Sequence, residues 1–169
     1  MSQFHRDSFI DPKDVPWIAT GLAFCALCVA WLAQYGGGLA PCELCYLQRY
    51  GYWGAIVLGL IATFFSRKPK LRKLWLNIMG LAFLVVVGIA VFHVGVERGW
   101  WQGSAACVGT ASAGQSVEDL TQSILNAPVT RCDEAAFELF GISMAGYDAL
   151  YALALAFFAF WGASRRGYR

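Results

Sequence analysis

Charged residues are scarce in this chain. They account for 14% of its 169 residues, against 58% hydrophobic residues, and the mean hydropathy is positive. Soluble globular domains carry about 25% charged residues, so this composition excludes an ordinary soluble domain. We therefore expect a membrane protein.

The chain contains long segments of apolar residues with few or no charges. A hydrocarbon core about 30 Å thick is crossed by roughly 20 helical residues. Four segments meet this requirement, at about residues 17–35, 44–65, 74–96 and 144–163. The prediction is an all-α membrane protein that forms one integral membrane domain over residues 1–169. It is a four-transmembrane-helix bundle with a long external loop, at about residues 97–143, between its third and fourth helices.

The N-terminus lacks the short basic region that opens a cleaved signal peptide. Residues 1–16 form a long leader that contains Asp7, Asp11 and Asp14, and the apolar stretch behind it is long enough to span a membrane. We therefore expect the first apolar segment to remain as a permanent helix.

Basic residues are few on one side of the predicted membrane and gathered on the other. Five lie in the connector over residues 66–73 and three in the tail over residues 164–169, whereas the loop at 97–143 has only two. Short loops rich in Lys and Arg stay in the cytoplasm, so both termini are predicted to be cytoplasmic. The net charge of +2 then reflects topology, and its distribution suggests no nucleic-acid partner.

Two of the six cysteines are predicted to react. Cys25 and Cys28 lie in the middle of the first span, where hydrocarbon suppresses ionisation, and are expected to be small inert hydrophobes. Cys42 and Cys45 lie at the outer boundary of the second span, behind Pro41, which suits the first turn of a helix. A helix N-terminus and CxxC spacing both lower the pKa of a thiol, which favours reaction at the second pair.

Arg49 adds a positive charge beside this pair. On a helix Cys42, Cys45 and Arg49 fall at i, i+3 and i+7, hence on one face. A charge inside a membrane span is costly, which indicates a function. We expect the guanidinium to stabilise a Cys45 thiolate and to donate hydrogen bonds to an oxygen-bearing acceptor from the lipid. The alternative is a topological anchor that extends to the lipid headgroups.

Cys107 and Cys132 form the third pair, in the external loop. Oxidising conditions there favour a disulfide, which is either a structural staple or a partner for exchange with the reactive pair. Zinc at Cys42 and Cys45 would need two more ligands. The loop cysteines could supply them in principle, but the oxidising conditions favour their disulfide and no further close-spaced cysteine or histidine pair accompanies them, so no metal site is predicted. Between the two cysteines, residues 116–128 show the spacing of a short amphipathic helix, lying on the membrane surface or packed against the loop.

Together these features resemble the DsbB family, the bacterial quinone-linked generators of disulfides. The resemblance covers essentially the whole chain. It rests on four spans, the Pro41-Cys42-x-x-Cys45-x-x-x-Arg49 motif at the start of the second, the stretch FHVGVERGWWQG at residues 92–103, and the loop cysteine pair. This family keeps the bacterial periplasm oxidising. The resemblance implies the bacterial inner membrane, with the active cysteines on the periplasmic side.

The resemblance also implies a quinone site. Cys42 and Cys45 would form the quinone-facing disulfide, and Cys45 would be the thiolate that engages ubiquinone or menaquinone. Arg49 and His93 match residues associated with the quinone in the family. For His93 the alternative is an interfacial residue paired with Glu97, one turn further along the helix.

For the loop pair, the resemblance implies a soluble partner. Cys107 and Cys132 match the pair that oxidises a DsbA-like periplasmic thioredoxin-fold protein, with Cys107 as the site of the mixed disulfide. The expected function is therefore a membrane thiol-disulfide oxidoreductase that reoxidises this partner and passes the electrons to quinone. One mild departure from the family is at position 48, where this chain has glutamine and some members have glutamate.

Three other functions stay open at this stage. A vitamin K epoxide reductase-like enzyme also uses four helices and paired cysteines, but its CxxC is expected near a late helix. A disulfide-braced tetraspan scaffold would keep its disulfides oxidised throughout. A transporter is the weakest alternative, because the spans offer few polar groups besides Arg49 and Asp148 to line a pathway.

Overall fold

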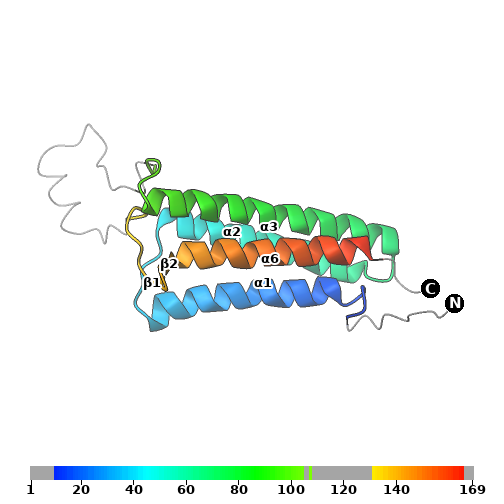
Figure 1. Ribbon diagram of the computed structural model, residues 1–169. Helices are drawn as coiled ribbons and strands as arrows, with labels where there is room; N and C mark the ends of the chain where they lie inside the picture. Colours follow the sequence, from blue (N-terminus) through cyan, green and yellow to red (C-terminus); the bar gives the residue numbers. More distant parts are fainter. Residues whose placement is uncertain (1–9, 105–106, 108–130, 166–169) are drawn as a thin grey trace, which may run out of the picture.

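The described residues fold into a bundle of four long helices (Figure 1). A computed structural model describes residues 10–104, 107 and 131–165. The elements in chain order are α1 (Val15–Trp31), the π-helical η1 (Leu32–Gly36), α2 (Glu43–Phe64), α3 (Pro69–Glu97), β1 (Glu138–Leu139), β2 (Ile142–Ser143) and α6 (Met144–Ser164). The amphipathic helix predicted over residues 116–128 lies outside the described residues.

Three of the described helical segments are long and apolar enough to cross a membrane: Val15–Gly36, Pro69–Glu97 and Met144–Ser164. This confirms a helical membrane protein. The α2 helix has 22 residues but is less apolar, because its first half contains Gln48, Arg49 and several tyrosines. The fourth transmembrane span therefore stays a prediction.

The predicted helix boundaries are close to the observed ones except at the start of α3. That helix begins at Pro69, five residues before the predicted span, so Lys70, Arg72 and Lys73 lie in its first turns. Proline suits the first position of a helix, because that residue needs no intrahelical N–H donor. The basic connector is thus partly helical.

The core of the bundle combines small and large side chains. The α6 helix contributes mostly alanines, and α1 contributes two alanines with Val15 and Leu27. The α3 helix contributes four large, fully buried side chains: Leu76, Met79, Phe83 and Val86. Without a strong hydrophobic drive between helices in lipid, close backbone approach at small residues supplies much of the packing energy.

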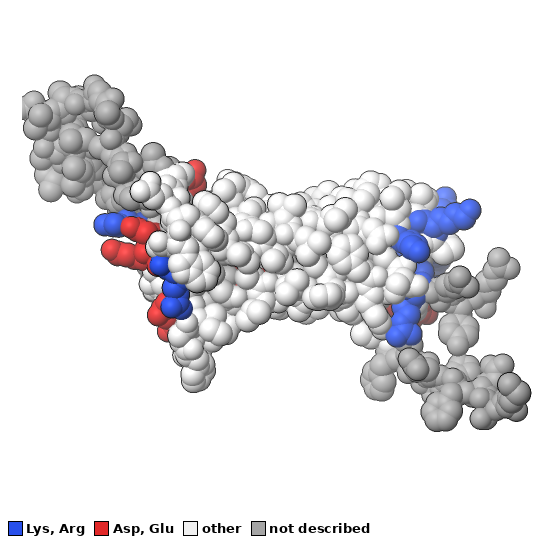
Figure 2. Space-filling view, turned by 45° about the horizontal axis from the view of Figure 1, so that its top comes forward, with Lys and Arg blue, Asp and Glu red and all other residues white. Residues whose placement is uncertain are grey.

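Charges separate to the two ends of the bundle (Figure 2). The larger group of Lys and Arg lies at one end, where α2 ends and α3 begins. Most of the visible Asp and Glu side chains lie at the other end, together with a smaller group of Lys and Arg, and a long uncharged surface separates the two ends. This is the pattern of a chain whose middle lies in hydrocarbon. The start of α2, with its cysteine pair, lies at the end that carries the acidic residues.

A short hairpin before α6 was not predicted from the sequence. Strands β1 and β2 pair antiparallel around Phe140 and Gly141, which both have positive φ, at 53° and 75°. Two consecutive positive φ values define the tight turn that matches strand twist, and glycine adopts this conformation without cost. Arg98 donates a 2.8 Å hydrogen bond to the Gly141 carbonyl, which ties the hairpin to the end of α3.

Candidate functional site

The start of α2 fixes the Cys42–Cys45 pair. Cys42 is the N-cap, with extended backbone (φ −81°, ψ 175°), and its sulfur accepts a 3.3 Å hydrogen bond from the Cys45 backbone N–H. The sulfur thus fills the role that a Ser or Asp oxygen usually has at a helix N-terminus. The helix begins at Glu43, so Pro41 precedes it, and the prediction that Pro41 lies in the first turn was wrong.

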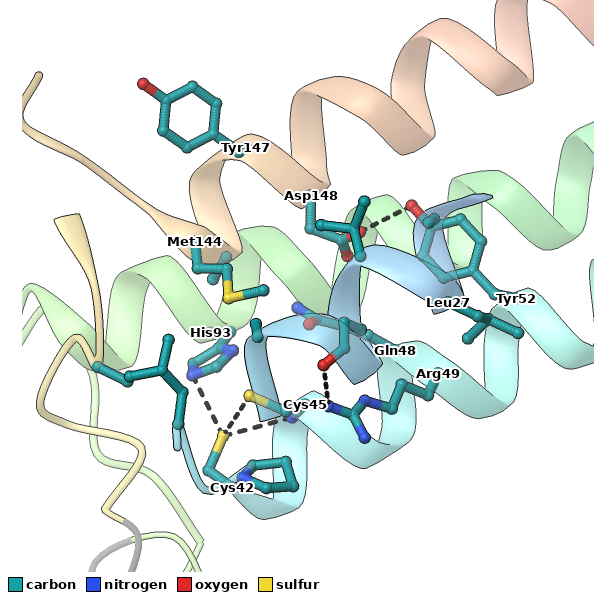
Figure 3. Close-up of a pocket in the computed structure, with 18 of the residues that line it drawn as sticks. Leu27, Cys42, Cys45, Gln48, Arg49, Tyr52, His93, Met144, Tyr147 and Asp148 are labelled. Carbon is teal, nitrogen blue, oxygen red and sulfur yellow. Dashed lines mark hydrogen bonds between the residues drawn. The ribbon is translucent and has the colours of Figure 1, made fainter. Parts of the chain in front are cut away.

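The two sulfurs of this pair face each other and a histidine (Figure 3). Cys42 Sγ lies 2.9 Å from Cys45 Sγ and 3.5 Å from His93 Nε2. The hydrogen bond with Cys45, followed by that with His93 and its positive charge, lowers the pKa of Cys42 to about 4, although burial opposes this. In the dithiol state of the pair the stabilised thiolate is therefore Cys42, whereas the sequence led us to expect it at Cys45.

His93 comes from α3, 51 residues further along the chain, and its side chain is almost fully buried. Its Nε2 also lies 3.7 Å from Oε1 of Glu97, the i+4 neighbour expected from the sequence. Nδ1 of His93 has no hydrogen-bond partner among the described residues. The histidine thus joins the Cys42 sulfur to a buried carboxylate and keeps one nitrogen free.

Arg49 lies one turn beyond Cys45, as predicted, but its hydrogen bonds go to the first helical segment. Nη1 donates to Gln34 Oε1, and Nη2 donates a 3.1 Å hydrogen bond to the Ala30 carbonyl. Gln34 belongs to η1, a π-helical segment of the kind that is frequent at functional sites. Arg49 therefore links the cysteine helix to the end of α1.

The loop cysteines lie next to the helix pair. Cys107 and Cys132 form a disulfide, both are fully buried, and they pack in one cluster with Cys42, Leu44 and Val96. Cys42 and Cys45 are free thiols. Two cysteine pairs that are far apart in the sequence thus share one buried site.

An apolar cavity of about 400 Å³ opens beside Cys42 and Cys45. Residues of α1, α2, α3 and α6 line it, including Cys25 and Leu27 from α1 and Met144 from α6. A cavity of this size and character is typical of a small-molecule site. Cys25 thus lies in the wall of the cavity, while Cys28 is half-buried, and both are free thiols.

Sequence reasoning missed a buried hydrogen bond in this cavity. The Tyr52 hydroxyl donates a 2.7 Å hydrogen bond to Asp148 Oδ1, while Asp148 Oδ2 has no partner among the described residues. Gln48 Nε2, also buried in the wall, likewise lacks a partner. Asp148 stood out in the sequence as a polar group in a span, but nothing there connected it to Tyr52.

Three potential ligand atoms also lie close together at this site. One atom each from Cys42, Cys45 and His93 lies within 4.8 Å of the others, which is close enough to hold a cation. Structural zinc sites use four protein ligands, whereas catalytic ones use three. The spacing by itself therefore assigns no metal ion to this site.

Known proteins resemble the chain over most of its length. A model of the family "Disulfide bond formation protein DsbB" matches residues 12–162. A "Disulfide bond formation protein B" of Marinobacter nauticus is 31% identical, with 80% of this chain and 83% of that protein covered. One of Chromobacterium violaceum is 28% identical, with 84% and 88% covered.

An uncharacterised protein of Rickettsia prowazekii (strain Madrid E) is 30% identical, and the match covers 81% of this chain and 79% of that protein. No solved structure shows significant similarity to the chain. The family match includes α1, α2, α3, most of α6 and both cysteine pairs at the site. The chain belongs to the DsbB family of disulfide bond formation proteins.

Proposed function

We propose that this disulfide oxidoreductase oxidises a DsbA-like periplasmic thioredoxin-fold protein and passes the electrons to ubiquinone or menaquinone in the bacterial inner membrane. The observation that carries the proposal is the buried cluster in which the loop disulfide packs against Cys42, beside an apolar cavity. A soluble dithiol has no access to a lipid-dissolved oxidant, so two pairs at different depths are needed to connect them.

The first step is exchange at the loop. A thiolate of the soluble partner attacks the Cys107–Cys132 disulfide at Cys107, and the second partner thiol then releases the partner in oxidised form. The loop pair has gained two electrons and two protons. The loop dithiol next exchanges with the oxidised Cys42–Cys45 pair, and this second exchange returns the loop to its disulfide.

The cavity beside Cys45 fits a quinone ring. Its wall is mostly apolar and includes Gln48 Nε2 and His93 Nδ1, two buried nitrogens that have no hydrogen-bond partner in the described part of the chain. Each is able to hydrogen-bond a carbonyl oxygen. A bound quinone would be the oxidant, and it would take two electrons and two protons from the Cys42–Cys45 dithiol. Cys45 lines the cavity from α2, and Arg49 lines it one turn deeper.

Charge supports the proposed orientation. We propose that both termini are cytoplasmic, because the basic residues gather at the end where α2 ends and α3 begins. The cysteine pairs, at the opposite end, would then face the periplasm. We also propose that residues 1–169 form one integral membrane domain.

Quinone absorbance tests the proposal. Purified protein in detergent is mixed with a reduced thioredoxin-fold dithiol and quinone, and quinone loss is followed alongside donor thiols. We expect one quinone consumed per dithiol oxidised, and no consumption with Cys45→Ser. If the wild-type protein consumes no quinone and its disulfides stay oxidised, the result would instead favour a membrane scaffold that is braced by disulfides.

A further inference from the structure

Glu43 connects the two cysteine pairs. By sequence it lies between Cys42 and Cys45, in the first turn of α2, whereas its carboxylate contacts the loop. Oε2 accepts a 2.8 Å hydrogen bond from Ser104 Oγ and lies 3.8 Å from Cys107 Sγ. A disulfide sulfur carries no proton, so this second approach becomes a hydrogen bond only when Cys107 is a thiol.

Ser104 holds the carboxylate and the cysteine together. Its hydroxyl donates to Glu43 and accepts a 3.2 Å hydrogen bond from the Cys107 backbone N–H. One serine oxygen thus fixes the position of Glu43 relative to Cys107. A general base must lie within hydrogen-bond reach of the proton that it removes, and this arrangement provides such reach for a thiol.

Electron transfer between the pairs requires that Cys107 lose a proton. The loop dithiol becomes a disulfide in two exchanges, and a thiolate is the attacking species in each. Cys107 either attacks the Cys42–Cys45 disulfide first, or attacks Cys132 after Cys132 has formed the mixed disulfide. In both orders it acts once as a thiolate.

We propose that Glu43 is the catalytic base that takes the proton of the Cys107 thiol during transfer from the loop pair to the Cys42–Cys45 pair. The inference rests on the proposed function. As the Cys107 thiolate forms its new S–S bond, the old S–S bond breaks and its electron pair leaves with the departing sulfur, which is protonated in turn. In sum the loop pair loses two electrons and two protons, and the Cys42–Cys45 pair gains two of each.

Other titratable groups at this end of the bundle have different partners. In the described part of the chain these include Cys42 and Cys45, Arg49 on α2, the His93–Glu97 pair on α3 and Arg98 after it, Asp148 on α6, Arg131, Asp133 and Glu134 before β1, and Glu138 in β1. Asp133 and Glu134 pair with Arg131, and Asp148 binds Tyr52. Among the described residues, the carboxylate that contacts the Cys107 sulfur is that of Glu43.

A purely structural role makes a different prediction. An acidic residue in the first turn stabilises a helix through its dipole, and the bond to Ser104 docks the loop. Glu43→Gln keeps a side-chain oxygen that can accept the Ser104 hydrogen bond, but the amide is no base. This substitution therefore separates docking from proton transfer.

The test follows internal transfer in the full chain in detergent. Protein with both pairs oxidised receives one equivalent of reduced thioredoxin-fold dithiol without quinone. Samples are quenched in acid at successive times, alkylated, and analysed by peptide mass to assign each thiol. At pH 6 we expect transfer to Cys42 and Cys45 to be about tenfold slower or more in Glu43→Gln, a modest effect for general base catalysis.

The pH profile identifies the base. At about pH 9 thiols ionise without help, since their ordinary pKa is about 8.5, so the Glu43→Gln and wild-type rates should converge. Glu43→Asp should recover part of the rate at pH 6. Glu138→Gln, a change in the exposed strand β1, should match the wild type at both pH values.

Two results would overturn the assignment. One is an unchanged rate in Glu43→Gln at pH 6 while the wild-type protein transfers electrons normally. The other is equal slowing of Glu43→Gln and Ser104→Ala at both pH values, which would make docking the role. If the wild-type loop pair is reduced but electrons never reach Cys42 and Cys45, the proposed function itself fails.

Discussion

At the scale of single residues, the Cys42 sulfur has an environment that few thiols share. It caps a helix, accepts a backbone N–H, and lies between a second thiol and an imidazole. Each of these contacts favours the anion over the neutral thiol. The Cys42–Cys45 pair therefore contains one sulfur that is stabilised as a thiolate and one that acts as its hydrogen-bond donor.

Titration of Cys42 tests this description. In a variant whose other four cysteines are alanine, the Cys42–Cys45 dithiol should show thiolate ultraviolet absorbance that disappears as the pH falls through about 4. The sign follows from the lowered pKa, because the anion persists at every pH above that value. Cys45→Ala removes the largest cause of the shift, so its midpoint should rise toward the ordinary 8.5 or so.

Tyr52 is a second residue whose role is open to direct measurement. Tyr52→Phe removes the buried donor to Asp148 and leaves a carboxylate oxygen unsatisfied, which should cost about 1–3 kcal/mol of unfolding free energy. Denaturant unfolding in detergent measures the change. Tyr151→Phe is the matched control, because its hydroxyl binds Leu22 at the surface and its loss should change stability by about 0.5 kcal/mol or less. If the two substitutions lower the unfolding free energy equally, the buried Tyr52–Asp148 hydrogen bond does not contribute the expected stability.

At the scale of the helices, small residues set how closely α1 and α6 approach. A Cβ added at Gly162 of α6 would lie 2.9 Å from Val15 Cβ, and Val15 is fully buried. A β-branched side chain at its own Cβ has no freedom to move aside. The contact between the start of α1 and the end of α6 therefore depends on glycine at this position.

Gly162→Ala should consequently destabilise the bundle by about 1–3 kcal/mol, the usual cost of overpacking. Thermal unfolding in detergent, followed by circular dichroism, would show the lowered midpoint. Gly54→Ala in α2 is the control, because an added Cβ there meets open space. Its stability should stay equal or rise by up to about 1 kcal/mol through helix propensity. A higher midpoint for Gly162→Ala would show that the helices separate at little cost.

At the scale of the whole molecule, the separation of charge predicts an orientation. Single cysteines placed at the two ends of a cysteine-free variant test it in intact spheroplasts. Phe140→Cys, in the turn of the hairpin, should react with a membrane-impermeant maleimide, and Lys70→Cys, near the start of α3, should react only after lysis. The reverse pattern would invert the proposed topology.

Local features of this protein could be read directly from the sequence. Apolar runs predicted where the long helices lie, and proline with CxxC spacing predicted the start of α2 to within two residues. The hairpin around Phe140 and Gly141 was missed, because two-residue strands leave almost no periodic signal. The early start of α3 was missed because the predicted span included only the apolar residues, whereas the helix begins before them, among the basic residues of the connector.

The sequence by itself determined where the long helices lie and how charge divides between the ends of the bundle, and it singled out Cys42 and Cys45 as the candidate reactive pair, because hydropathy, helix caps and thiol activation act over a few neighbouring residues. Only the tertiary structure decided that His93 meets Cys42, that Tyr52 meets Asp148, and that Glu43 bridges to Cys107. These contacts join segments 51 to 96 residues apart. Their formation depends on how each helix is rotated against its neighbours, which is fixed by the packing of small and large side chains across the whole bundle.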